Sequence, residues 1–331
     1  MIAMNSRRYA FRATGIVLRS MWHRAEGRFS LLVLGVWILV SLVSVFWTPW
    51  SLWWTDGYHV WQKPSMRHLL GTDGTGADVL SWLMAGSRTN LLICVLTVAV
   101  TAIFGLLLLA AMLARATIFA QISVVVIDAL ISLPTVLIAL ILAVPFGPSV
   151  AVIIAACGFG YGLNLARIAR PQALLIARSG YVESALSNGA RASGVFLRHI
   201  VPNIMPVLTV QLSISAGTVV LAESGLTYLG IGVQSGVPSW GHSLATSVSF
   251  INIYPLTVLW PGLIITCIVL SLNLCGDTLR DCADPLSNVQ LRNAQFNSGQ
   301  ERSGQVRSGQ VSSGQARNDQ LNRVTTKGSG Q

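Results

Sequence analysis

Charged residues are scarce in this sequence, and their scarcity excludes an ordinary water-soluble domain. Only 10% of the 331 residues are Asp, Glu, Lys or Arg, whereas soluble domains carry about 25%. Five intervals contain none of these four residue types: 29–55, 89–114, 129–166, 199–222 and 224–276. Because about 20 apolar residues let a helix cross a bilayer, these intervals predict an all-α, polytopic protein embedded in the lipid bilayer.

Several patterns that carry chemistry are also missing. The five cysteines form no CxxC pair and fall mostly in apolar runs, so we expect packing residues rather than a metal site or a disulfide framework. The five histidines show no ligand spacing, and no serine lies in a nucleophile-elbow context. A phosphate-binding P-loop needs a lysine in a glycine-rich context, and neither Lys63 nor Lys327 has one. These absences predict a non-catalytic chain that binds no cofactor, nucleotide or metal itself.

The apolar runs predict six transmembrane helices. Turn residues and charges place them at about 29–47, 89–114, 118–144, 150–166, 204–221 and 256–275, with Pro134 inside the third. They divide the chain into a basic N-terminal tail (1–28), a six-span domain (29–286) and a C-terminal tail (287–331). Within the domain we expect external loops at 51–88 and 222–254 and a cytoplasmic loop at 167–203.

Basic residues orient the spans. With the N-terminus inside, the inner segments before the C-terminal tail hold 12 arginines, whereas the outer segments hold only Lys63, Arg67 and Arg88. This asymmetry predicts cytoplasmic termini and explains the net charge of +10 without nucleic acid. The basic N-terminal tail is expected on the inner membrane surface. The C-terminal tail repeats Ser-Gly-Gln every five residues and is expected to be disordered.

The polar stretch from Tyr181 to Asn203 interrupts the apolar pattern. Pro171 suits the first turn of a helix, and Gly189 suits a left-handed cap at the end of a helix. Ser193 then caps a second short helix, which Pro202 stops. Small side chains around Gly189 would let another surface approach closely. Two short helices of this shape suit docking into a cleft, but on composition alone an ordinary solvated loop is favoured.

This stretch resembles the "EAA" loop of binding-protein-dependent ABC importer permeases, and "RHIVPN" resembles a motif of their dipeptide/oligopeptide/nickel branch. Three other segments are similar to that branch in the same order: "GTDGTGADVLSWLMAGSRTNL", "LAESGLTYLGIGVQSGVPSWG" and "NLCGDTLRDCADP". The chain is identified as the C-type permease of the pair. The matched positions in the first and last of these segments include Gly71, Thr72, Asp73, Gly76 and Asp78, and Gly276, Asp277, Arg280 and Asp281.

The resemblance implies a type I ABC importer permease fold in a bacterial inner membrane. It implies four kinds of partner: a second homologous permease in a heterodimer, two ATP-binding chains that use ATP and Mg, an extracytoplasmic solute-binding protein, and the bilayer. Short peptides are the expected cargo, with nickel or another small solute as the alternative. The residues expected to dock on the ATPase are Glu183, Ser184, Ala185 and Gly189, with Arg198 and Pro202 fixing the second helix.

The sequence departs from the family pattern at a few positions. Ser184 replaces an Ala beside the docking Glu. On the external side, Ala77 replaces an Arg, Asn90 replaces a Ser, and Ser235-Gly236 replaces Pro-Pro. We expect the external changes to affect contacts with partners or substrate more than the fold.

Two acidic residues within or beside spans leave alternatives open. Asp128 is either a proton relay or substrate ligand, or lies at the inner interface paired with Arg115 or Arg167. Glu223 faces either the substrate path or the solvated outer interface. If Asp128 is a proton relay, an ion-coupled secondary transporter is the rival function, but the spans show no clear internal repeat of the kind found in such folds. The glycines of "GFGYG" in the fourth span predict close helix packing rather than a nucleotide site.

Overall fold

The structure is a computed structural model that describes residues 19–114 and 117–283, and every regular element in these residues is a helix. Residues up to Arg280 form one compact unit. The all-α expectation is confirmed for this part of the chain. The predictions for residues 1–18, Arg115 and the tail at 287–331 lie outside the described residues. The elements are α2 (Ala25–Phe46), α3 (Val79–Met112), α4 (Thr117–Ile131), α5 (Thr135–Phe146), α6 (Val150–Ala177), α7 (Gly180–Ser187), α8 (Ala192–Val195), the π-helical turn η1 (Phe196–Ile200), α9 (Val201–Tyr228), α10 (Trp240–Val248) and α11 (Leu256–Ala283).

Among the described residues, five helical segments are long and apolar enough to cross a membrane. They are α2, α3, α6, the continuous run of α8, η1 and α9 (Ala192–Tyr228), and α11 over Leu256–Cys282. α4 and α5 meet the same criterion only as a pair, and the pair is bent by 83°. The predicted six spans are therefore present when this bent pair is counted as one span.

The bend between α4 and α5 falls at Pro134. Proline lacks the backbone N–H that an inner helical residue donates, and its ring disfavours helical torsion angles in the preceding residue. α4 ends at Ile131, and Pro134 is the N-cap of α5 in an extended conformation (φ −59°, ψ 131°). The third span was expected at about 118–144 with Pro134 inside it; the structure shows that the helix breaks at Pro134 and that two bent helices occupy this segment.

Several helices extend beyond the spans that charge and apolarity delimit. α3 begins at Val79, inside the segment expected as an external loop, and carries Arg88 in its third turn. α6 continues to Ala177, so Pro171 lies inside it rather than in the first turn of a new helix. α9 continues to Tyr228, and α10 adds a helix to the other external loop. A charged residue marks where a helix leaves the hydrocarbon, but the backbone hydrogen bonds continue past that point.

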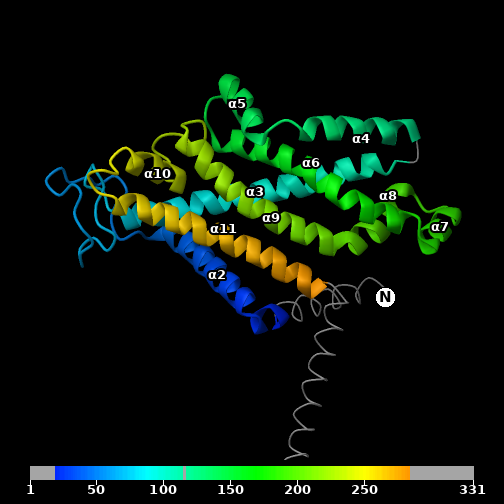
Figure 1. Ribbon diagram of the computed structural model, residues 1–331, viewed down its shortest axis with the longest axis horizontal. Helices are drawn as coiled ribbons and strands as arrows, with labels where there is room; N and C mark the ends of the chain where they lie inside the picture. Colours follow the sequence, from blue (N-terminus) through cyan, green and yellow to red (C-terminus); the bar gives the residue numbers. More distant parts are fainter. Residues whose placement is uncertain (1–18, 115–116, 284–331) are drawn as a thin grey trace, which may run out of the picture. The chain divides into compact units, whose positions relative to one another are not determined.

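α3 and α6 pack side by side through the unit, with α4 and α5 along one flank and α2 on the other (Figure 1). Small residues bring the two central helices together. A Cβ built on Gly158 would lie 2.5 Å from Val100 Cγ1 and 2.9 Å from its Cβ, and one on Gly162 would lie 2.7 Å from Phe104 Cδ1. The close packing predicted for the glycines of this segment is confirmed.

Gly158→Ala should destabilise the protein. The added methyl group meets the stiff, β-branched Val100, so one helix must shift, and overpacking of this kind costs about 1–3 kcal/mol. Gly35→Ala is the matched control, because Gly35 also lies inside a spanning helix and its Cβ would meet nothing within 4 Å. We expect a lower thermal midpoint in mild detergent for Gly158→Ala only. Equal midpoints for Gly158→Ala and the wild type would contradict the packing argument.

Candidate functional site

The strongest candidate site is the two-helix elbow, which we define as α7, α8 and η1 with the connecting residues 188–191. It joins the end of α6 to the start of α9, at the end of the unit where α7 and α8 are labelled in Figure 1. Arg178 caps α6, and Ser179 adopts an extended conformation (φ −74°, ψ 146°) that starts α7. The Ser179 hydroxyl donates to the Ile176 carbonyl at 2.6 Å. The chain therefore passes from α6 to α7 within two residues.

Gly189 makes the corner of the elbow. Its φ of +82° lies in the left-handed region that favours glycine. The Gly189 N–H donates to the Leu186 carbonyl at 3.1 Å, and the Ala190 N–H donates to the Ala185 carbonyl at 3.1 Å. This pair of bonds is the Schellman arrangement that ends many helices. The expected left-handed cap at Gly189 is confirmed.

The second helix of the elbow differs from the expectation. Arg191, not Ser193, occupies the N-cap of α8, and no side chain caps it. The helix also does not stop at Pro202, because η1 carries the chain directly into α9. In η1 the Val201 N–H donates to the Phe196 carbonyl, five residues back. The wider π-helical turn accommodates a proline ring that would clash with the carbonyl of Arg198 in an α-helix.

The residues expected to dock lie on the outer surface of the elbow. Glu183, Ser184, Gly189, Arg198 and Pro202 are exposed, and Ala185 is half-buried. Within the part of the chain that the structure describes, neither Glu183 nor Arg198 forms an ion pair. Both charges are therefore available to another chain.

The inner surface of the elbow is fastened to the helix bundle. Val182 of α7 is 1% exposed. The Asn203 side chain, in the first turn of α9, donates to the His199 carbonyl at 2.6 Å and to the Tyr181 hydroxyl at 3.4 Å. The Tyr181 and His199 rings lie 6.2 Å apart. The elbow and the start of α9 are thus held together, so that a force on α7 is transmitted to a spanning helix.

An apolar groove of about 870 Å³ separates part of the elbow from α3. Leu106 and Leu107 of α3 line one wall, and Val182, Leu186 and Phe196 of the elbow line the other. The elbow therefore packs only loosely against α3, whereas it continues directly along the chain into α9.

The family motif at residues 71–78 builds the start of α3. Asp78 is 4% exposed and is the N-cap of α3. Its Oδ2 accepts hydrogen bonds from the backbone N–H and the hydroxyl of Ser81. Its Oδ1 contacts Nδ1 of the buried His68 at 3.0 Å. Asp73 Oδ1 accepts from the N–H groups of Thr75 and Ala77. The matched glycines have positive φ (Gly71 +82°, Gly76 +75°), and the side chain of Thr72 bonds back to the loop at the His59 carbonyl. These residues have a structural role in this chain.

The loop before α3 also brings together the partly buried Asp56 and the exposed His59. Their side chains meet at 2.6 Å (Asp56 Oδ2 to His59 Nδ1). This hydrogen bond and one from the Tyr58 N–H lower the pKa of Asp56 below its usual value. Asp56 therefore stays ionised to a lower pH than a free aspartate.

Glu223 lies in the packed interior rather than at a water-exposed surface. It is 1% exposed, near the end of α9, and its carboxylate accepts three hydrogen bonds. Asn90 Nδ2 of α3 donates at 2.7 Å, the Ser224 hydroxyl at 3.2 Å and the Thr227 hydroxyl at 3.1 Å. Thr227 in turn accepts from the Val233 N–H at 3.0 Å. We call these residues the Glu223 network; it joins α3, α9 and the loop before α10.

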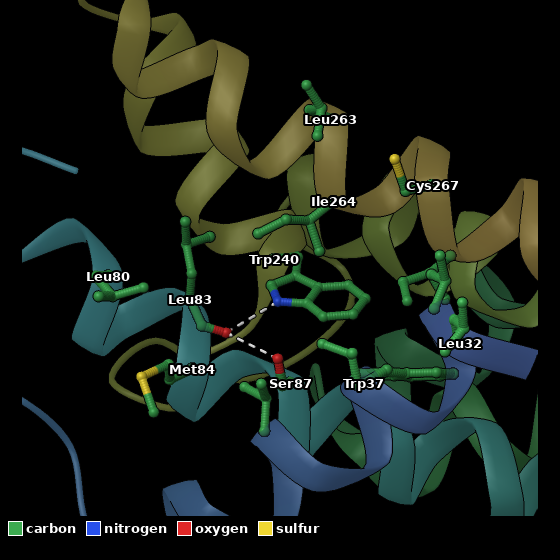
Figure 2. Close-up of a pocket in the computed structure, with 14 residues that line it drawn as sticks. Leu32, Trp37, Leu80, Leu83, Met84, Ser87, Trp240, Leu263, Ile264 and Cys267 are labelled. Carbon is green, nitrogen blue, oxygen red and sulfur yellow. Dashed lines mark hydrogen bonds between the residues drawn. The ribbon is translucent and has the colours of Figure 1, made fainter. Parts of the chain in front are cut away.

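Trp240 packs beside this network and was not identified from the sequence. Its indole N–H donates to the Leu83 carbonyl at 3.0 Å (Figure 2). Its ring lies 5.7 Å from that of Trp37 on α2, and both rings line an apolar pocket between α2, α3 and α11. The backbone N–H of Trp240 donates to the side-chain oxygen of Asn90 at 3.5 Å. Both residues belong to segments that resemble the family, but nothing in the sequence indicates that they meet.

Asp128 has the partner that one reading expected. Its Oδ1 lies 3.4 Å from Arg167 Nε, and the two side chains are 45% and 55% exposed.

The C-terminal motif lies on the last turns of α11. Gly276 is buried, and a Cβ there would lie 3.2 Å from that of Ser213 on α9, whereas Asp277, Arg280 and Asp281 are exposed. The motif thus combines one helix contact with a charged end.

The comparisons with known proteins agree with this geometry. Residues 103–287 match the family described as binding-protein-dependent transport system inner membrane component. The chain is 37% identical to "Probable peptide ABC transporter permease protein y4tQ" of Sinorhizobium fredii, over 70% of this chain and 79% of that protein. It is 30% identical to the oligopeptide transport system permease protein OppC of Escherichia coli K12, over 81% and 92%.

Among solved structures, the fold resembles an inward-facing MetNI methionine ABC transporter. The TM-score is 0.50 at 16% identity, over 61% of this chain and 97% of that chain. This likeness supports the type I permease architecture. On the family match and the relatives, the chain belongs to the family of binding-protein-dependent transport system inner membrane components, as the resemblance implied.

Proposed function

We propose that this chain is one permease subunit of an ATP-driven importer and forms half of a pathway for short peptides. The observation that carries the proposal is the elbow, which exposes Glu183 and the backbone of Gly189 while Val182 and Asn203 fasten it to the bundle. The relatives named for peptide and oligopeptide transport support the substrate class.

In this proposal the elbow docks on an ATPase chain that uses ATP and Mg. Closure of two ATPase chains would push α7, and the covalent and hydrogen-bonded link to α9 would turn the push into a rigid-body movement of a span. A second, homologous permease completes the pathway, and an extracytoplasmic binding protein delivers the peptide. Both termini lie in the cytoplasm, because the basic residues cluster in the segments on that side.

Purification of the tagged chain from its native membrane in mild detergent tests the proposal. We expect two further kinds of chain to co-purify, an ATPase and a second permease. Inside-out and right-side-out vesicles that contain the complex then distinguish import from export. ATP-dependent uptake of a labelled dipeptide supports the proposal, and isolation of the chain alone with solute movement driven by an ion gradient refutes it.

A further inference from the structure

The Asp128–Arg167 ion pair lies on two helices of candidate membrane spans, where charged side chains are rare. Asp128 is on α4 and Arg167 is on α6, and both helices belong to segments that meet the criteria for membrane spans. Both side chains are about half exposed. Ionisable residues in spans rarely face lipid, because the hydrocarbon offers no water or counter-charge. The exposed side of this pair therefore calls for an aqueous or protein surface.

The polar surface continues along α4. Residues spaced by three or four positions share one side of a helix, and on α4 this side carries Gln121, Val125 and Asp128, all exposed, with the exposed Ser132 just beyond the end of the helix. The neighbouring exposed side of the same helix is apolar, with Phe119, Ile122 and Val126 about half exposed. The exposed polar residues of this segment thus gather on one side, where Val125 is the apolar exception, and the neighbouring side is apolar.

α6 repeats the pattern beside it. Asn164 lies nearly one turn before Arg167 on an adjacent part of the helix surface and is partly exposed. In the proposed orientation, this direction leads from the inner surface toward the middle of the membrane. If the ion pair only marked the inner interface, the residues deeper in the span would be apolar. Together we call Gln121, Asp128, Ser132, Asn164 and Arg167 the polar stripe.

We propose that the polar stripe lines the peptide pathway and that Asp128 and Arg167 bind the charged ends of the passing peptide. This inference rests on the proposed function. A short peptide carries an ammonium group and a carboxylate, for which Asp128 and Arg167 are the complementary groups. The two side chains meet through one contact of 3.4 Å and are half solvated, and exposed pairs of this kind contribute little stability. A peptide can therefore separate them at little cost.

Cysteine labelling tests the location. The background is a chain in which the partly exposed Cys267, Cys275 and Cys282 are replaced by serine. Two single variants are made in it: Ser132→Cys on the polar stripe and Val126→Cys on the apolar side of α4. The complete transporter in vesicles is treated with a quaternary-ammonium thiosulfonate, which reacts only with thiols in contact with water. We expect Ser132→Cys to react at least about tenfold faster and to be protected by transported dipeptide. Equal reactivity of the two thiols overturns the proposal.

Exchange of the charges tests the role. Asp128→Arg combined with Arg167→Asp restores an ion pair, so a purely structural pair would be rescued by the exchange. A pair that binds a peptide delivered in one direction would not be rescued. We expect dipeptide uptake per assembled complex to fall at least about tenfold in the single variants and in the exchange variant, with ATP hydrolysis retained. Wild-type uptake by the exchange variant refutes binding of the peptide ends, whereas absence of uptake by the wild type refutes the proposed function instead.

Discussion

Glu223→Ala should lower the stability of the protein more than any other single change to its polar residues. The substitution removes the acceptor of three hydrogen bonds, from Asn90, Ser224 and Thr227, all at buried positions. Each buried donor left without a partner costs about 1–3 kcal/mol, so the combined loss is a few kcal/mol. We expect a large fall in the thermal midpoint in detergent and loss of uptake, because α3, α9 and the loop before α10 are no longer held together.

Glu223→Gln is the control that separates shape from charge. The glutamine oxygen can accept from Asn90 and Ser224, and its amide can donate to the Thr227 hydroxyl. Among the described residues no basic side chain pairs with Glu223, so the substitution removes a buried charge without leaving another one unpaired. We expect wild-type stability and uptake for Glu223→Gln. A loss as large as that of Glu223→Ala would show that the charge, and not the acceptor geometry, is required.

The spans and the elbow could be predicted from the sequence because both depend on local properties. Absence of charge over 20 or more residues identifies a span wherever the helix packs, and Gly189 identifies a helix end because few other residues adopt its φ of +82°. The bend at Pro134 was missed because proline is tolerated in some spanning helices, and the local sequence does not decide between tolerance and a break.

The Glu223 network could not be predicted, because its residues meet only in the folded chain. Asn90 and Glu223 are 133 positions apart, and Trp240 and Leu83 are 157 apart. Similarly, Pro202 signals the end of a helix in the sequence, but the structure passes it by means of a π-helical turn. The family resemblance supplied the positions of the motifs, yet the structure shows that Asp78 caps α3 and that Gly276 packs against α9.

Gly189→Val should leave the membrane spans intact and impair attachment of the ATPase. Valine at a φ of +82° is strained by about 1–2 kcal/mol, and more for its β-branched side chain. Within this chain a Cβ at Gly189 would meet nothing within 4 Å, so the strain is relieved by turning α7 rather than by unfolding the bundle. A docking surface that loses about 1.4 kcal/mol binds about tenfold more weakly. We therefore expect about tenfold less ATPase to co-purify with the tagged Gly189→Val chain. The thermal midpoint of the chain should not change.

Gly180→Val is the matched control for the elbow. Gly180 is also an exposed glycine of the elbow with open space around it, but its φ is not positive. The same side chain there should leave ATPase recovery unchanged. Gly189→Asn tests the cause, because asparagine tolerates the left-handed region. Recovery in Gly189→Asn near that of the wild type would assign the defect to backbone conformation, whereas continued loss would assign it to close approach of the ATPase at Gly189. Full recovery and uptake in Gly189→Val would refute docking at the elbow, since neither the strain nor the added side chain would then reach the interface.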